Sequence, residues 1–228
     1  MMQNDEQTRN LARVAALAVA PAALAAALVA HPFISGRLPN EAAIADAVVG
    51  GTTGWALVHL AAAVASALLA IAFLALRSYL REAGENRYSA VGVPFVVLGS
   101  TLFAVLPGME FVPLAAAETG AATADVAAAQ SEITGWFLAV LVVSTLSFVV
   151  GVLLFAYALI VTRVASDRFT LVVTVALVAM GTARFVPFSA VQFYVQGVAA
   201  LVALWPLAYL MWTQPTPVRH ARPVGSSA

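Results

Sequence analysis

The sequence predicts an all-α membrane protein, a polytopic bundle of six transmembrane helices with the N-terminus and the C-terminus in the cytoplasm. Three observations indicate this fold. Of the 228 residues, 62% are hydrophobic and only 10% are charged, whereas soluble domains usually carry about 25% charged residues. The chain contains six apolar runs, each near the roughly 20 residues that a helix needs to cross a bilayer. Its arginines are also unevenly distributed between the connecting segments.

The six spans are each bounded by polar residues, glycine or proline. We expect them at residues 11–30, 55–76, 90–112, 135–161, 169–186 and 191–212. The first span contains Pro21, which predicts a kink, and a secretory signal peptide is the alternative interpretation of this segment. The third span is interrupted by Pro107-Gly108. The fourth span is the longest and predicts a helix that tilts or extends beyond the bilayer.

The remaining segments complete the predicted organisation. Residues 1–10 form a cytoplasmic N-terminal tail, residues 11–212 the transmembrane domain, and residues 213–228 a disordered cytoplasmic C-terminal tail. In the first connection, residues 40–49 favour a short surface helix with Asn40 as its N-cap. The segment 114–133 is predicted to be an alanine-rich linker.

The arginine distribution predicts the orientation, since the chain contains no lysine. Nine arginines fall on one side of the predicted topology: Arg9, Arg13, Arg77, Arg81, Arg87, Arg163, Arg168, Arg219 and Arg222. Only Arg37 and Arg184 fall on the other side. By the positive-inside rule, both chain ends face the cytoplasm of a prokaryotic cell (inner) membrane. Trp55 and Trp136 are then expected at the outer interface of the bilayer.

Composition excludes several classes of function. The formal net charge is zero, so nothing favours nucleic acid as a partner, and the lipid bilayer is the expected one. Because the chain has no cysteine, it cannot form disulfides, cysteine-ligated zinc sites or iron–sulfur clusters. Without lysine it cannot form a retinal Schiff base.

With this threading, every span brings a polar residue to the depth of the outer leaflet. These residues are His31, His59, Glu110, Glu132, Arg184, Gln192 and Gln196. Ionisable groups at that depth usually face the interior of the bundle, and a break in a membrane helix is tolerated only against protein or a wet cavity. The pattern therefore predicts an outward-facing polar pocket. Its expected ligand-binding residues are His59, Glu110, Arg184, Gln192 and Gln196.

Several functions are compatible with such a pocket. One is binding of a small molecule, lipid or ion by a transporter or receptor-like component, with Arg184 contacting an anionic group. Another is a metal or haem site at His31, His59 and Glu110, since imidazole and carboxylate suit zinc, copper or iron; the residues indicate no particular cofactor. No nucleophile lies beside an obvious base, which favours a non-enzymatic role. A non-catalytic assembly subunit, with a structural Glu110–Arg184 ion pair, is the remaining hypothesis.

Three short motifs lie in the first half of the chain: His31-Pro32 after the first span, Trp55 with His59-Leu60 in the second, and Gly108-Met109-Glu110 in the third. With these motifs the chain resembles a group of alanine-rich prokaryotic membrane proteins that have no assigned function. The resemblance implies no activity, and it favours His31, His59 and Glu110 as one functional set.

Overall fold

The computed structural model describes residues 2–215, and this part of the chain contains helices, turns and loops but no β-strand. The prediction of an all-α fold is confirmed. The helical segments are α1 (Met2–Ala30), α2 (Glu41–Gly50), α3 (Thr52–Glu82), α4 (Tyr88–Met109), α5 (Phe111–Glu118), α6 (Thr123–Thr162), α7 (Asp167–Thr182), the 3-10 turn η1 (Ala183–Phe185), the π-helical turn η2 (Val191–Val195) and α8 (Gln196–Thr213).

Six helical segments of the described chain are long and apolar enough to cross a membrane, as expected for a multi-pass membrane protein. They are Glu6–Ala30, Thr52–Glu82, Tyr88–Glu118, Thr123–Thr162, Asp167–Phe185 and Val191–Thr213. If α4 and α5 are counted as one broken span, the described chain has seven helices. The seventh is the short α2, which does not span the bundle and was not counted in the predicted six-helix bundle. The sequence did indicate this helix. Asn40 caps it, since the Asn40 Oδ1 accepts a hydrogen bond from the Ala43 N–H at 3.2 Å.

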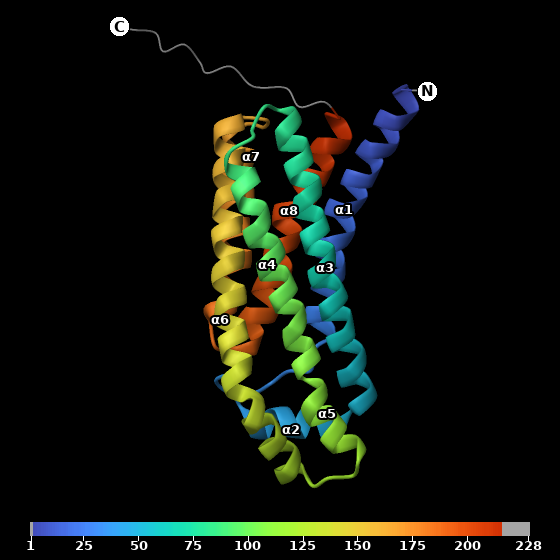
Figure 1. Cartoon of the computed structure of the whole chain (residues 1–228), viewed down its shortest axis with the longest axis vertical. Helices are drawn as coiled ribbons and strands as arrows, with labels where there is room; N and C mark the ends of the chain where they lie inside the picture. Colours follow the sequence, from blue (N-terminus) through green and yellow to red (C-terminus); the bar gives the residue numbers. More distant parts are fainter. Residues whose placement is uncertain (1, 216–228) are drawn as a thin grey trace, which may run out of the picture.

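The helices stand side by side, and the start of α1 lies at the same end of the bundle as the end of α8 (Figure 1). Helix α1 packs against α3 and α8, and α4 packs along α6. Helix α2 lies across the opposite end, beside α5 and the start of α6 (Figure 1). That the end with the start of α1 faces the cytoplasm of a cell membrane stays a prediction from the arginine distribution.

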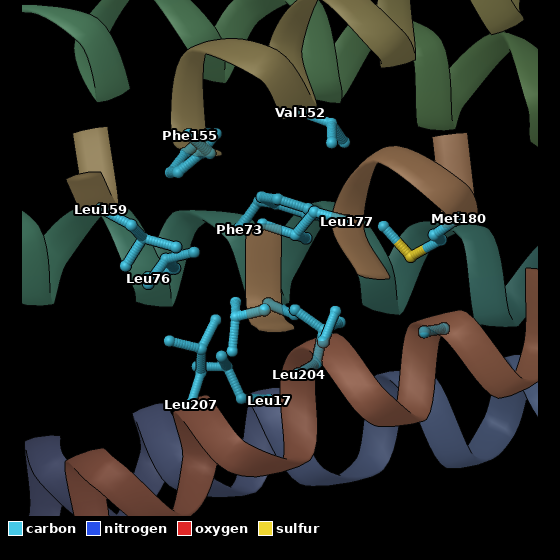
Figure 2. Packing of buried hydrophobic residues seen from close by; sticks show 14 of the residues in the cluster. Leu17, Phe73, Leu76, Val152, Phe155, Leu159, Leu177, Met180, Leu204 and Leu207 are labelled. Atoms are coloured by element: carbon cyan, nitrogen blue, oxygen red, sulfur yellow. The ribbon is translucent and has the colours of Figure 1, made fainter. Parts of the chain in front are cut away.

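The middle of the bundle is a close-packed apolar core drawn from α1, α3, α4, α6, α7 and α8. Figure 2 shows Leu17 and Leu204 directed toward Phe73 and Leu177. Glycine allows α4 and α6 to approach closely, because a Cβ on Gly99 would lie 2.6 Å from the Phe148 backbone nitrogen. Small residues at helix contacts are typical of membrane bundles, where apolar lipid provides little driving force for association.

Helix α6 differs most from its predicted extent. It begins at Thr123, inside the segment expected to be a linker, so that prediction is wrong for most of its length. Alanine is the strongest helix former, and the alanine-rich segment simply continues the helix. At 1.5 Å per residue, the 40 residues of α6 span about 60 Å, roughly twice the ~30 Å hydrocarbon core of a bilayer.

The extension of α6 packs with α2 and α5 around a second, smaller apolar cluster. Its buried members are Ile34, Ile44, Ala45, Val48, Trp55, Leu114 and Val126. Trp55 is only 2% exposed and packs inside the protein, while its depth at the outer interface of the bilayer stays a prediction.

The structure tests the predicted N-terminal tail but only the first residues of the predicted C-terminal tail. Residues expected in an N-terminal tail are helical from Met2. Helix α8 ends at Thr213, and residues 216–228 of the predicted C-terminal tail lie outside the described part of the chain.

Candidate functional site

The break between α4 and α5 positions Glu110. Helix α4 continues through Pro107-Gly108, where the interruption was predicted, and ends one residue later at Met109. Pro113 has no N–H to donate to the Met109 carbonyl four residues earlier, which weakens the helix at this point. The indole N–H of Trp55 donates a hydrogen bond to the Glu110 carbonyl oxygen at 3.2 Å. The Glu110 backbone is thereby fixed to α3.

A cavity of about 290 Å³ is lined by residues of α3, α4, α6, η1 and η2, by the end of α1 and the loop after it, and by Ile44 of α2. Most of its wall is apolar. The polar side chains that line it are His31, His59, Glu110, Gln130, Thr134, Thr145, Arg184 and Gln192. The structure thus brings four of the five predicted ligand-binding residues to one cavity. The fifth, Gln196, does not line the cavity, and its side-chain amide contacts the Arg184 guanidinium instead.

Arg184 is carried by the 3-10 turn η1 and is only 3% exposed. Its guanidinium carbon lies 3.7 Å from the centre of the Phe103 ring and 4.5 Å from that of Phe148. In the amide orientation that satisfies both groups, the Gln196 oxygen accepts hydrogen bonds from the Arg184 Nε and Nη2, each at 2.9 Å. The Nη1 of Arg184 is buried without a hydrogen-bond partner.

The loop after η1 is tied to neighbouring elements. Gln192 donates a hydrogen bond from Nε2 to the Arg184 carbonyl oxygen at 3.2 Å. The Ser189 hydroxyl donates to the Ile34 carbonyl oxygen at 2.8 Å. These contacts connect η1 and η2 with the loop after α1, and they hold Arg184 at the cavity wall.

Glu110 is 7% exposed, and no cationic side chain of residues 2–215 forms an ion pair with it. Its Oε1 accepts a hydrogen bond from the Gln130 Nε2 at 3.3 Å, whereas its Oε2 is buried without a partner. Within the described residues, ion pairs join Glu82 to Arg9 and Arg13, at the other end of the bundle. The structural ion pair between Glu110 and Arg184, expected for an assembly subunit, is not formed.

His31 and His59 form a pair of imidazoles, with 3.3 Å between their Nε2 atoms. The Nδ1 of His31 lies 2.8 Å from the Pro32 carbonyl oxygen, and that of His59 lies 2.7 Å from the Trp55 carbonyl oxygen. Phe193 packs against the His31 ring at 4.4 Å between centroids. Burial lowers the pKa of His31 below its ordinary value of 6.5, although the Pro32 carbonyl acts in the opposite direction.

The predicted metal set of His31, His59 and Glu110 is not assembled as a three-residue cluster. No group of three or more histidine, cysteine, aspartate or glutamate side chains within residues 2–215 could hold a metal ion. The haem alternative does not fit, because two imidazole nitrogens 3.3 Å apart leave no room for a porphyrin between them. What remains is the histidine pair itself.

Sequence reasoning missed the contribution of α6. Glu132, expected at the start of a helix, is exposed within α6, and Gln130 and Thr134 line the cavity. These two residues are four apart and so share one helix face. The signal was present but was hidden by the interpretation of this segment as a linker.

The fold and the site define a multi-pass membrane protein with a mainly apolar cavity that contains unpaired polar atoms. Comparison of the chain with protein-family models, curated proteins and solved structures finds no match. The chemistry of the site therefore has to be inferred from its own residues.

Proposed function

We propose that this protein binds an amphiphilic molecule with an anionic group in the cavity, as a receptor-like or transport component. The observation that carries the proposal is the buried Arg184 guanidinium, whose Nη1 has no hydrogen-bond partner and which meets no carboxylate in the described part of the chain. An unpaired charge in an apolar environment is costly. A carboxylate or phosphate on the ligand would accept a charge-assisted hydrogen bond from Nη1.

The walls favour an amphiphile over a small inorganic ion. Three lining residues, Leu138, Val142 and Phe185, are 38%, 48% and 49% exposed, unlike the buried core. They belong to α6 and η1, inside the membrane-spanning segments. We infer that the cavity opens toward lipid between these two elements, so that an acyl chain would leave through an apolar rim while its headgroup meets Arg184.

The packing of the bundle supports binding more than ion conduction. The core cluster between the cavity and the opposite end of the bundle contains no carboxylate, guanidinium or imidazole group, and its most polar buried member is the Tyr79 phenol. Moving a bare ion through such a region would require unpaired charge at membrane depth. Any transport cycle would therefore have to open this core.

The proposal can be tested by thermal unfolding of the full chain in a non-ionic detergent. The probes are dodecyl phosphate and dodecanoate, with dodecanol as the neutral control. Binding at a hundredfold excess over the dissociation constant stabilises by about 2.7 kcal/mol, which for a chain of this size corresponds to roughly 5–10 °C. We expect both anionic probes to stabilise the wild-type protein and Arg184→Gln to abolish the shift.

Two variants serve as controls. Arg37→Gln removes an exposed arginine at the same end of the bundle and should leave the shift unchanged. Arg184→Lys preserves the charge if Arg184→Gln fails to fold, and it should bind more weakly because it lacks the planar guanidinium. Equal stabilisation by dodecanol, or an undiminished shift in both Arg184 variants, would contradict the proposal.

A further inference from the structure

The hydrogen bonds of His31 and His59 determine which ring nitrogen carries the proton. A carbonyl oxygen only accepts hydrogen bonds, so the Nδ1 of each ring must donate, to Pro32 in one case and to Trp55 in the other. In the neutral form, the Nε2 of each ring then has a lone pair and no hydrogen. These two lone-pair nitrogens lie 3.3 Å apart.

Two acceptors at this distance repel each other unless a positive group lies between or beside them. From this geometry we infer that His31 and His59 form a binding site for a divalent transition metal, with zinc as the best fit. The neutral imidazole nitrogen is a common ligand of such metals. The inference goes beyond the proposed anion binding and does not depend on it, since neither imidazole contacts Arg184.

The spacing of the two nitrogens matches shared coordination. Zinc–imidazole bonds of about 2.0–2.1 Å would place two nitrogens 3.3 Å apart at a nitrogen–metal–nitrogen angle of about 105–110°, close to the tetrahedral angle. The distance between the two nitrogens is therefore the one that a shared ion requires.

The surroundings of both rings also resemble those of metal ligands. Histidines that bind metals usually donate their other ring N–H to a carbonyl or carboxylate, which fixes the tautomer and the ring orientation. Both rings make this contact already. The Trp55 ring lies 4.3 Å from that of His59, and Phe193 lies 4.4 Å from that of His31, between centroids.

Two histidines fill only half of a tetrahedral coordination shell. Both line the cavity, so the two remaining positions would be open to water or to a ligand within it. The unpaired carboxyl of Glu110 lies in the same cavity and would offset part of the added charge. The site would thus be an open metal site on the cavity wall.

Metal binding can be measured on the full chain, purified with a tag that contains no histidine and stripped of metal. Co²⁺ serves as the optical probe, because tetrahedral cobalt absorbs strongly in the visible range, and Zn²⁺ content is measured by elemental analysis. We expect one equivalent per chain. His31→Ala and His59→Ala should each weaken binding by at least the roughly 10–100-fold that follows loss of a second-shell partner.

The third histidine provides the matched control, since His220→Ala should bind Co²⁺ as the wild type does. His31→Phe keeps an aromatic ring beside Phe193 and Trp55 but removes the Nε2 that would bind the metal. It therefore tests the contribution of this ligand if His59→Ala is unstable. Absence of Co²⁺ and Zn²⁺ binding by the wild-type protein, or undiminished binding by His31→Phe, would overturn the inference. Arg184→Gln should retain metal, so failure of the anion site and failure of the metal site can be distinguished.

Discussion

The buried charged residues at the two ends of the bundle differ in whether they form ion pairs. At the end where α1 begins, Arg13 is 5% exposed and its guanidinium meets the Glu82 carboxylate at 2.5 and 2.8 Å. At the cavity end, Arg184 and Glu110 are 3% and 7% exposed, and within the described residues neither forms an ion pair. Each has a buried polar atom without a hydrogen-bond partner, as Arg13 has at its Nε. Arg184 is held only by aromatic rings and an amide.

This difference separates structural charges from candidate functional ones. Burying a charge is tolerated when a partner and hydrogen bonds compensate it, and Glu82 meets that condition for Arg13. Arg184 and Glu110 do not compensate each other although both line one cavity. An anionic ligand, as proposed, would give Arg184 the partner that it lacks, whereas Glu110 would need a cation or a hydrogen-bond donor.

The largest expected effect on the free energy of unfolding comes from adding side-chain volume to the close-packed core. Gly99→Ala should destabilise the protein by the upper part of the ~1–3 kcal/mol that overpacking costs, because the new Cβ would meet Phe148 backbone atoms that cannot move aside. Ala62→Leu at the cavity wall has room for its side chain and should change the free energy of unfolding by less than about 1 kcal/mol. It should also weaken dodecyl phosphate binding. Denaturant unfolding in detergent measures both variants, and equal costs would remove the contrast in packing.

The second contrast concerns charge. Glu82→Gln should cost about 2 kcal/mol, somewhat below the ~3–5 kcal/mol for breaking a fully buried ion pair, because the Glu82 side chain is 28% exposed. Glu110→Gln removes no ion pair and should stay within about 1 kcal/mol of wild type, the value of a single hydrogen bond. If unfolding experiments showed the same loss for both, Glu110 would be a structural residue.

The smallest expected effect concerns Glu85, which precedes α4. Burial by itself would raise the pKa of Glu85, but hydrogen bonds from Ser89, Tyr88 and Arg87 outweigh it and lower the pKa below the ordinary 4.5. The resulting stabilisation is complete above about pH 4.5 and is lost as the pH falls through the lowered pKa. Glu85→Gln should cost about 1 kcal/mol near neutral pH, as for a lost helix cap.

Comparing the acid limb of the stability curve in the two proteins checks this prediction. The wild type should lose more stability than Glu85→Gln as the pH falls below 4.5. An identical pH dependence would mean that the carboxylate of Glu85 contributes nothing to the start of α4.

Much of the candidate site could be predicted because its residues are unusual in their context. A carboxylate after a helix break and an arginine near a span end are conspicuous in an apolar chain, and Glu110 and Arg184 do line the cavity. Gln130 was missed because its segment was assigned to a linker. The burial of Trp55 could not be predicted, because a tryptophan at the start of a span is typical of the membrane interface, and only the tertiary structure shows its hydrogen bond to the Glu110 carbonyl oxygen.

The sequence by itself determined that the chain is an all-helical, multi-pass membrane protein, since hydropathy accumulates along each segment whatever its neighbours are. It also determined which polar residues stand out. Only the tertiary structure decided that His31 meets His59 and that Arg184 does not meet Glu110. Those contacts depend on how each helix is rotated about its axis and on the rotamer of each side chain, and neither is contained in the composition of a segment.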